Sequence, residues 1–187
     1  DLCSIGISCG GPLDSKKGII LSPPNLPGWD EVPIVDYLED KMGMKAYLKN
    51  DADACALAEW RYGAGIGSKN MIFLTFGTGL GAGLILNGSL YEGASGMAGE
   101  VGHIRIDDNG PVGYGKAGSF EGFCSGGGIK QLGQRKAIEL LAQGKRASFH
   151  NASLDDITTK AIAEAARGGD ESALEVFKEA GRYLGKG

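Results

Sequence analysis

Short apolar runs alternate with segments of helical spacing in the first third of the chain. Apolar runs predict strands at residues 2–9, 18–21 and 45–48. Residues 33–42 predict a helix, because apolar side chains recur every four residues between a proline and a glycine. A second helix is expected to begin at Asn50 or Asp51 and to end near residue 62. Strands mixed with helices indicate an α/β fold.

The rest of the chain has its strands first and its helices later. The glycines at residues 63–67 are the expected boundary between two lobes, 1–66 and 67–187. An Asn-Gly pair at residues 87–88 predicts a tight hairpin turn. The expected strands are 70–76, 80–86, 89–91 and 101–106, followed by a loop over 107–118. The expected helices are 128–142, 154–166 and 171–184. Ser153 and Asp156 resemble a capping box, and Asp170 is expected to cap the last helix.

Composition narrows the class of protein. The chain carries a net charge of -4 with acids and bases mixed, so no basic block indicates nucleic-acid binding in this region. Its 33 glycines cluster between apolar runs, as expected where the backbone turns or approaches a ligand. The four cysteines form no C-x-x-C pair, which favours a reduced, cytoplasmic protein. No run approaches the roughly 18 apolar residues of a membrane span. Both ends resemble interrupted elements, so we expect an internal piece of a longer chain.

The first candidate site is Asn50-Asp51, where a predicted strand ends and a helix begins. Ligands of open α/β sheets bind at the carboxyl ends of strands. The positive end of the helix dipole favours an ionised Asp51, which could accept a proton from a hydroxyl group. A plain helix cap explains the same two residues, and from this motif alone the cap is the favoured interpretation.

The second candidate is the turn Gly77-Thr78-Gly79 between two predicted strands. Glycines leave backbone N–H groups accessible, which suits phosphate oxygens. Neither a G-K-[ST] sequence nor a following helix is present, so the turn is neither a Walker loop nor a dinucleotide fingerprint. A glycine-rich hairpin that lets another strand pack closely is an equally good explanation.

Two further groups of polar residues could contact a ligand. Glu100, His103 and Glu121 could hold a metal or hydrogen-bond the hydroxyls of a sugar, although a surface glutamate and a satisfied core histidine are commoner. No H-E-x-x-H motif supports a zinc protease. Asn25 and Trp29, in a proline-rich loop, could face a sugar, but a packed loop is the preferred explanation for Trp29.

Five stretches, in order along most of the chain, resemble the ROK family (repressor, open reading frame, kinase). They are GISCGGPLD (6–14), SPPNLPGW (22–29), NDADACALAEWRYGAG (50–65), LTFGTGLGAGLILNGSLYEGASGMAGEVGH (74–103) and GSFE (118–121). The resemblance implies the actin-like, ribonuclease-H-like fold, with two lobes around a cleft. It implies ATP-dependent phosphorylation of a hexose or N-acetylhexosamine, with Mg²⁺ accompanying ATP.

The resemblance also assigns roles to individual residues. Asp51 matches the catalytic base. Asn50, Glu100, His103 and Glu121 match the family's sugar ligands, and Asn25 is added from the proline-rich loop. Gly77, Thr78 and Gly79 match the second phosphate-binding loop. The matching residues bind hydroxyls shared by most hexoses, so the sequence does not choose among glucose, mannose, fructose, allose and N-acetylmannosamine. Family members often pair, but no exposed stripe in this sequence demands it, so a homodimer is one alternative and the oligomeric state stays open.

The sequence departs from the family pattern in three places. Many members carry a zinc knuckle, C-x-C-G-x-x-G-C, whose cysteines align with Val112, Tyr114 and Ser119. None of the three ligates Zn²⁺, so no zinc and no other protein-bound metal are expected. The first phosphate loop and the adenosine-contacting segment are absent from these residues. A sugar-sensing repressor is the alternative to a kinase, and the Asn50-Asp51 pair favours the kinase.

Overall fold

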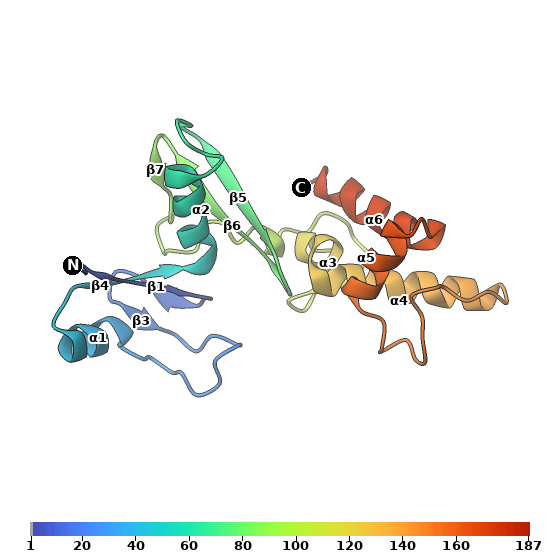
Figure 1. Ribbon diagram of the computed structural model, residues 1–187, viewed down its shortest axis with the longest axis horizontal. Helices are drawn as coiled ribbons and strands as arrows, with labels where there is room; N and C mark the ends of the chain where they lie inside the picture. The colour runs from blue at the N-terminus through green and yellow to red at the C-terminus, as the bar shows by residue number, and fades with distance from the viewer. Residues whose placement is uncertain (1) are drawn as a thin grey trace. The chain divides into compact units, whose positions relative to one another are not determined.

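The computed structural model describes residues 2–187 as an α/β protein whose residues group into two units (Figure 1). The first unit comprises residues up to Leu74 together with Ala82–Gly99, and the second comprises Thr75–Gly81 together with Glu100–Gly187. The predicted boundary between residues 66 and 67 falls inside the first unit. The assignment of residues to two lobes stays a prediction.

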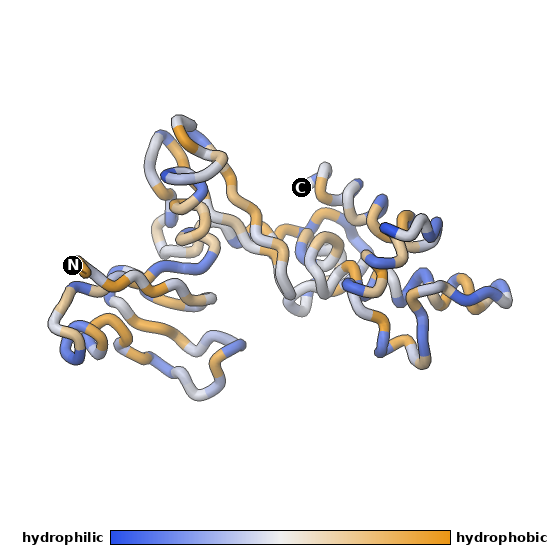
Figure 2. The backbone as a smooth tube through the Cα atoms, in the orientation of Figure 1, coloured by the Kyte–Doolittle hydropathy of each residue, from blue (hydrophilic) through white to orange (hydrophobic). Residues whose placement is uncertain are grey.

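The first unit is built on two parallel neighbours, β1 and β4, in register from Ile5 opposite Ala46 to Cys9 opposite Asn50. Parallel neighbours need a crossover connection, and α1 lies within it. The elements of this unit are β1 (Ile5–Cys9), β2 (Leu13–Asp14), β3 (Ile19–Ile20), α1 (Ile34–Met42), β4 (Ala46–Asn50), α2 (Asp51–Tyr62) and β7 (Ser89–Leu90). Two longer strands, β5 (Met71–Phe76) and β6 (Leu80–Leu86), contribute residues to both units and are largely hydrophobic (Figure 2).

Helix α2 packs so closely against β6 that the strand backbone at Gly83 nearly touches the helix backbone. Ala52 and Ala56 are buried, and a Cβ at Gly83 would lie 2.5 Å from the Ala52 carbonyl oxygen and from the Ala56 Cβ. Only glycine on the strand and small residues on the helix permit this approach. The alanine-rich sequence of α2 therefore reflects close packing as well as helix propensity.

The second unit packs four helices around one hydrophobic core. Phe123 and Tyr183 stack at its centre, with ring centroids 3.5 Å apart, and the Tyr183 hydroxyl donates to Asp107 Oδ2 at 2.7 Å. The hydroxyl of Tyr183 holds the pKa of the Asp107 carboxyl below its usual range. The elements are the 3₁₀ helix η1 (Val101–His103), β8 (Val112–Gly113), β9 (Lys116–Ala117), α3 (Phe120–Cys124), α4 (Gly126–Ala142), α5 (Thr159–Arg167) and α6 (Glu171–Leu184).

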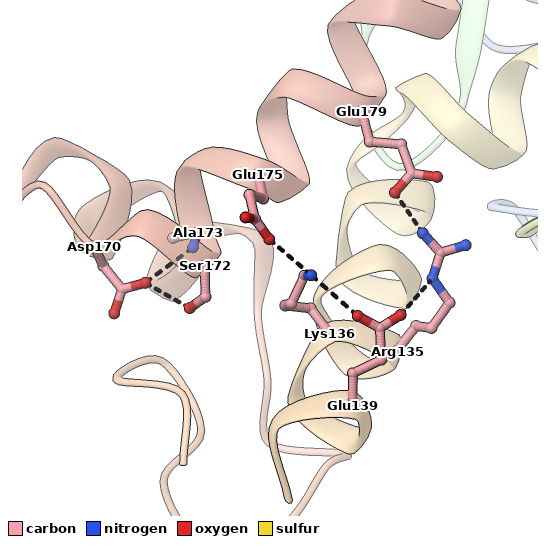
Figure 3. Close-up of polar contacts among 8 residues, drawn as sticks. All are labelled: Arg135, Lys136, Glu139, Asp170, Ser172, Ala173, Glu175 and Glu179. Carbon is pink, nitrogen blue, oxygen red and sulfur yellow. Dashed lines mark hydrogen bonds and ion pairs between the residues drawn. The ribbon is translucent and has the colours of Figure 1, made fainter. Parts of the chain in front are cut away.

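Charged side chains connect α4 to α6 on the surface of this unit (Figure 3). Lys136 Nζ lies 2.7 Å from a carboxylate oxygen of Glu175 and 3.0 Å from one of Glu139. Arg135 pairs with Glu139 and with Glu179. Individual exposed ion pairs contribute little free energy, so the buried core and not this network accounts for most of the helix packing.

One predicted element is wrong and one begins later than predicted. Residues 101–106 are not a strand: η1 occupies Val101–His103, and its Gly102 packs so close to the Leu80 carbonyl that a side chain would collide with it. Helix α5 begins at Thr159 instead of residue 154, since Thr158 provides the cap by accepting from the Ala161 N–H at 3.1 Å. The Asp156 carboxylate does accept from the Ser153 N–H, but within a separate turn.

Strands β8 and β9 form a hairpin inside residues 107–118, which were predicted to be loop. The short helix α3 was not predicted at all. The remaining predicted elements are confirmed to within a few residues. Across residues 2–187, no helix combines the length and the apolar character that crossing a membrane requires.

Asp170 caps α6, and its removal should destabilise the second unit. Its Oδ1 accepts from the Ala173 N–H at 2.9 Å and from the Ser172 hydroxyl (Figure 3). Asp170→Ala should lower the free energy of unfolding by about 1 kcal/mol, measured by urea denaturation at pH 7. Asp170→Asn is the matched control, because asparagine also caps helices and should lose much less.

The contribution of Asp170 should also depend on pH. Hydrogen bonds from the hydroxyls of Ser148 and then Ser172 lower the pKa of Asp170 to about 2. Because the folded pKa lies below the unfolded value of about 3.9, this stabilisation is present above pH ~4 and is lost as the pH falls toward 2. The difference between the parent and Asp170→Ala should therefore shrink between pH 5 and pH 2.5. A difference that stays constant over this range would contradict the assignment.

Candidate functional site

In the first unit, Asn50 and Asp51 lie beside the glycines that follow β1. Because β1 and β4 are parallel neighbours, both end at the same edge of the sheet. A Cβ at Gly10 would lie 3.9 Å from Asp51 Oδ2, and a Cβ at Gly11 would lie 3.6 Å from Asn50 Nδ2. The two polar side chains and the glycine pair thus form one polar edge.

The two residues of this pair have different roles in the helix. Asn50 is the cap of α2: its Oδ1 accepts from the Ala52 N–H at 2.9 Å. Asp51 is exposed in the first turn, and its Oδ1 also accepts from that N–H at 2.9 Å. Burial, followed by the nearby negative charge of Asp51, raises the pKa of the Cys9 thiol. Because Asn50 already supplies the cap, helix capping alone does not explain Asp51.

Lys49, which directly precedes Asn50 and Asp51, is held by an ion pair. Lys49 Nζ lies 2.7 Å from Glu92 Oε1, which also accepts from the Ser15 hydroxyl at 3.0 Å. Partial burial alone would raise the pKa of Glu92, but the hydrogen bonds from Lys49 and Ser15 outweigh it and hold that pKa low. The end of β4 is therefore tied to the segment after β7.

In the second unit, the turn at Gly77–Gly79 is braced by the first residues of α4. The Gly126 N–H donates to the Gly77 carbonyl at 2.8 Å, and the Gly127 N–H donates to the Thr78 carbonyl at 3.4 Å. Two of the donors that a helix N-terminus usually leaves unpaired are consequently used to hold this turn. Thr78 itself is exposed.

Glu121 packs against the same turn. Its Oε2 accepts from the Leu80 N–H at 3.0 Å, and a Cβ at Gly79 would lie 2.6 Å from that oxygen. Glycine at residue 79 thus permits the carboxylate to reach the start of β6. Two predicted site segments, Gly77–Gly79 and Glu121, are brought together here.

Glu100 directly precedes η1 and His103 ends it, so one turn of the short helix separates them. Their side chains approach to 3.5 Å, from Glu100 Oε2 to His103 Nε2. The His103 ring packs against the ring of Tyr114, with centroids 4.7 Å apart at an interplanar angle of 48°. A carboxylate and an imidazole at this separation can accept and donate hydrogen bonds to neighbouring hydroxyls.

Asn25 lies in the loop between β3 and α1. It is exposed in a turn that is closed by hydrogen bonds between Ser22 and Trp29 and between Leu26 and Pro23. A ligand contact for Asn25 stays a prediction. Asn25, Asn50 and Asp51 belong to the first unit, whereas Gly77–Gly79, Glu100, His103 and Glu121 belong to the second.

Comparisons with known proteins identify the family. The family model described as "ROK family" matches residues 1–187. This chain belongs to the ROK family. A glucokinase of Halalkalibacterium halodurans is 35% identical over 187 residues, covering 99% of this chain and 56% of that protein. A xylose repressor of Caldicellulosiruptor bescii is 32% identical, covering 100% of this chain and 46% of that protein. The chain thus spans about half the length of the relatives it matches.

A solved structure agrees with this assignment. The ROK family glucokinase of Streptomyces griseus, crystallised in complex with glucose and AMPPNP, is 36% identical with a TM-score of 0.78, covering 99% of this chain and 60% of that chain. The fold is therefore that of the ROK kinases, which is the predicted actin-like α/β fold.

The residues that align with the ROK zinc knuckle do not fit a metal. The Ser119 hydroxyl accepts from the Gly122 N–H at 3.0 Å and so caps α3. Tyr114 packs on His103, and Val112 has an aliphatic side chain. Within residues 2–187, no three His, Cys, Asp or Glu side chains form a group that could hold a metal ion.

Sequence reasoning missed the contacts of Tyr114 and Lys116 with His103 and of Gln131 with Val112. Lys116 Nζ donates to the His103 carbonyl at 2.6 Å, and the Gln131 side chain pairs with both backbone groups of Val112. The signal available was Gly113-Tyr114-Gly115, a glycine-flanked aromatic residue next to the predicted ligands. Because the sequence alone did not reveal a hairpin turn here, this segment could not be distinguished from an ordinary loop.

Gly79→Ala should displace Glu121 and destabilise the second unit. The added methyl group would collide with the Glu121 carboxylate, which would then lose its hydrogen bond from the Leu80 N–H. We expect a loss of about 1 kcal/mol in the free energy of unfolding, measured by urea denaturation, because the flexible carboxylate can move aside but the Leu80 N–H loses its acceptor. Gly77→Ala is the matched control, because a Cβ there meets no atom within 4 Å. Equal losses in the two variants would contradict the assigned contact.

Proposed function

We propose that the full-length protein is an ATP-dependent sugar kinase that phosphorylates a hexose, with glucose the leading substrate. The observation that carries this proposal is the position of Asp51: an exposed carboxylate at the carboxyl end of β4, beside Gly10 and next to a helix cap supplied by Asn50. Glucokinase relatives at 32–35% identity support the substrate class.

In the proposed reaction, Asp51 accepts the proton of the attacking sugar hydroxyl. The hydroxyl oxygen forms a bond to the γ-phosphorus as the bond to the bridging oxygen of ADP breaks, which yields sugar phosphate and ADP. Phosphoryl transfer depends mainly on positioning and charge neutralisation. Asn50, Glu100, His103 and Glu121 would hold the sugar, and the turn at Gly77–Gly79 would contact phosphate oxygens. Mg²⁺ would enter bound to ATP.

A sugar-responsive repressor is the second candidate. Xylose repressors reach 32% identity over the whole chain, similar to the glucokinases. A repressor needs the sugar ligands but needs no general base, so retention of Asp51 beside the Asn50 cap favours the kinase.

A coupled ADP-release assay on the full-length protein should separate these candidates. With Mg-ATP and a panel of hexoses, pentoses and N-acetylhexosamines, we expect sugar-dependent ADP release, with glucose the most efficient substrate. Tight sugar binding by calorimetry without any ADP release would refute the kinase and support the repressor.

Asp51→Asn should abolish turnover while sugar binding is retained. Removing a general base lowers kcat by about 10²–10⁴-fold, whereas the neutral amide preserves the size of the side chain. The dissociation constant for the sugar, measured by calorimetry, should change little. Asp40→Asn is the control, since Asp40 is an exposed carboxylate on α1 of the same unit. Unchanged kcat in Asp51→Asn would remove Asp51 from the mechanism.

A further inference from the structure

The β8–β9 hairpin contains an unfavourable residue at its tip. Two residues, Tyr114 and Gly115, connect its strands, and both have positive φ, 47° and 74°. Positive φ at both central positions is the pattern of a type I′ turn, which favours Asn-Gly. The chain uses that pair in its other such hairpin, where Asn87 and Gly88 have φ of 53° and 75°. A tyrosine in this conformation costs free energy that asparagine or glycine would largely avoid.

Burial does not explain the choice of tyrosine. Tyr114 is 71% exposed, so its ring gains little from removal from water. Its one ring-to-ring contact among residues 2–187 is with His103, at 4.7 Å between centroids. A strained residue that persists without burial indicates a functional constraint. The ring contact with His103 indicates that the constraint is the position of the His103 imidazole.

The hairpin holds His103 at a second point. Lys116, the first residue of β9, donates from Nζ to the His103 carbonyl at 2.6 Å. The imidazole ring and the backbone of the same residue are therefore both held by one six-residue hairpin, residues 112–117. His103 Nε2 lies 3.5 Å from Glu100 Oε2, so the hairpin holds the imidazole within reach of that carboxylate.

The hairpin is itself anchored to the helices of the second unit. Gln131, on α4, accepts from the Val112 N–H at 2.9 Å and donates to the Val112 carbonyl at 2.8 Å. The buried Ser119 hydroxyl donates to the Gly113 carbonyl at 3.4 Å. These contacts occupy the region where ROK relatives are expected to hold zinc, and they require no metal.

We propose that the β8–β9 hairpin is a metal-free positioning device for His103, in which Tyr114 supports the imidazole ring and Lys116 holds the backbone. This inference rests on the proposed sugar-binding role of His103. Tyr114 and Lys116 are positioning residues: they act on the sugar through the orientation of His103.

The test uses Tyr114→Asn in the full-length protein. Asparagine suits the turn but removes the ring, so the urea midpoint should stay equal or rise while KM for the preferred sugar rises roughly three- to tenfold, a range set by the strength of aromatic pairs. We expect kcat to change less than KM. Tyr114→Phe retains the ring and should keep the parental KM. A merely structural tyrosine would instead leave KM unchanged, and that result would overturn the proposal, as would an equal rise in KM for Tyr114→Phe.

A spectroscopic measurement tests the device even if the protein proves not to be a kinase. The ring current of Tyr114 should shift the His103 imidazole resonances, assigned with a His103→Gln variant. Tyr114→Asn should move these resonances toward random-coil positions, Tyr114→Phe should not, and sugar affinity by calorimetry should fall only in Tyr114→Asn. Unmoved resonances in Tyr114→Asn would overturn the proposal independently of turnover.

Metal content provides the last control. Sugar affinity of the parent should be unaffected by a zinc chelator, and Lys116→Met should weaken affinity to a similar degree with and without it. One zinc per chain, together with loss of sugar affinity on chelation, would show that a metal positions His103 and would overturn the proposal.

Discussion

The close approach of α2 to β6 is the constraint on which the geometry of the first unit depends. Because Gly83 has no side chain, the backbone of the strand reaches the Ala52 carbonyl and Ala56. The helix cannot shift along or away from the strand without losing this contact, and Asn50-Asp51 form its first turn. The position of the proposed base is thus set by packing among small residues, to which the Lys49–Glu92 ion pair adds an electrostatic tether.

The second unit fixes its polar side chains through glycines in a similar way. Gly79 admits the Glu121 carboxylate, Gly102 packs on the Leu80 carbonyl, and Gly126 and Gly127 brace the turn before β6. Each glycine removes a side chain where two backbone segments, or a backbone and a carboxylate, must meet. The high glycine content inferred from composition therefore reflects several separate close contacts, while the hydrophobic core behind them consists of ordinary aromatic and aliphatic residues.

The sequence predicted the elements whose signals are local. The helices α1, α2 and α6 have caps and periodic apolar residues, and the Asn87-Gly88 turn has a known dipeptide preference. It failed for Val101–His103, a 3₁₀ turn whose Gly102 packs on Leu80, which is distant in sequence. The pairing of Glu100 with His103 follows from this unpredicted turn, and the contact of Glu121 with Leu80 depends on tertiary structure. The roles of these residues came from resemblance to a family and could not be obtained from spacing.

Neither unit is a continuous stretch of chain, because the polypeptide passes between them after Leu74, Gly81 and Gly99. During synthesis on the ribosome, the first unit lacks β6 and β7 until residue 90 has been made and is complete only at residue 99, although α2 ends at residue 62. The turn at Gly77–Gly79 likewise waits for α4, its bracing partner, to be made. Neither unit is therefore complete before the chain has passed into the other, and a deletion that spans one of these crossing points removes residues from both units.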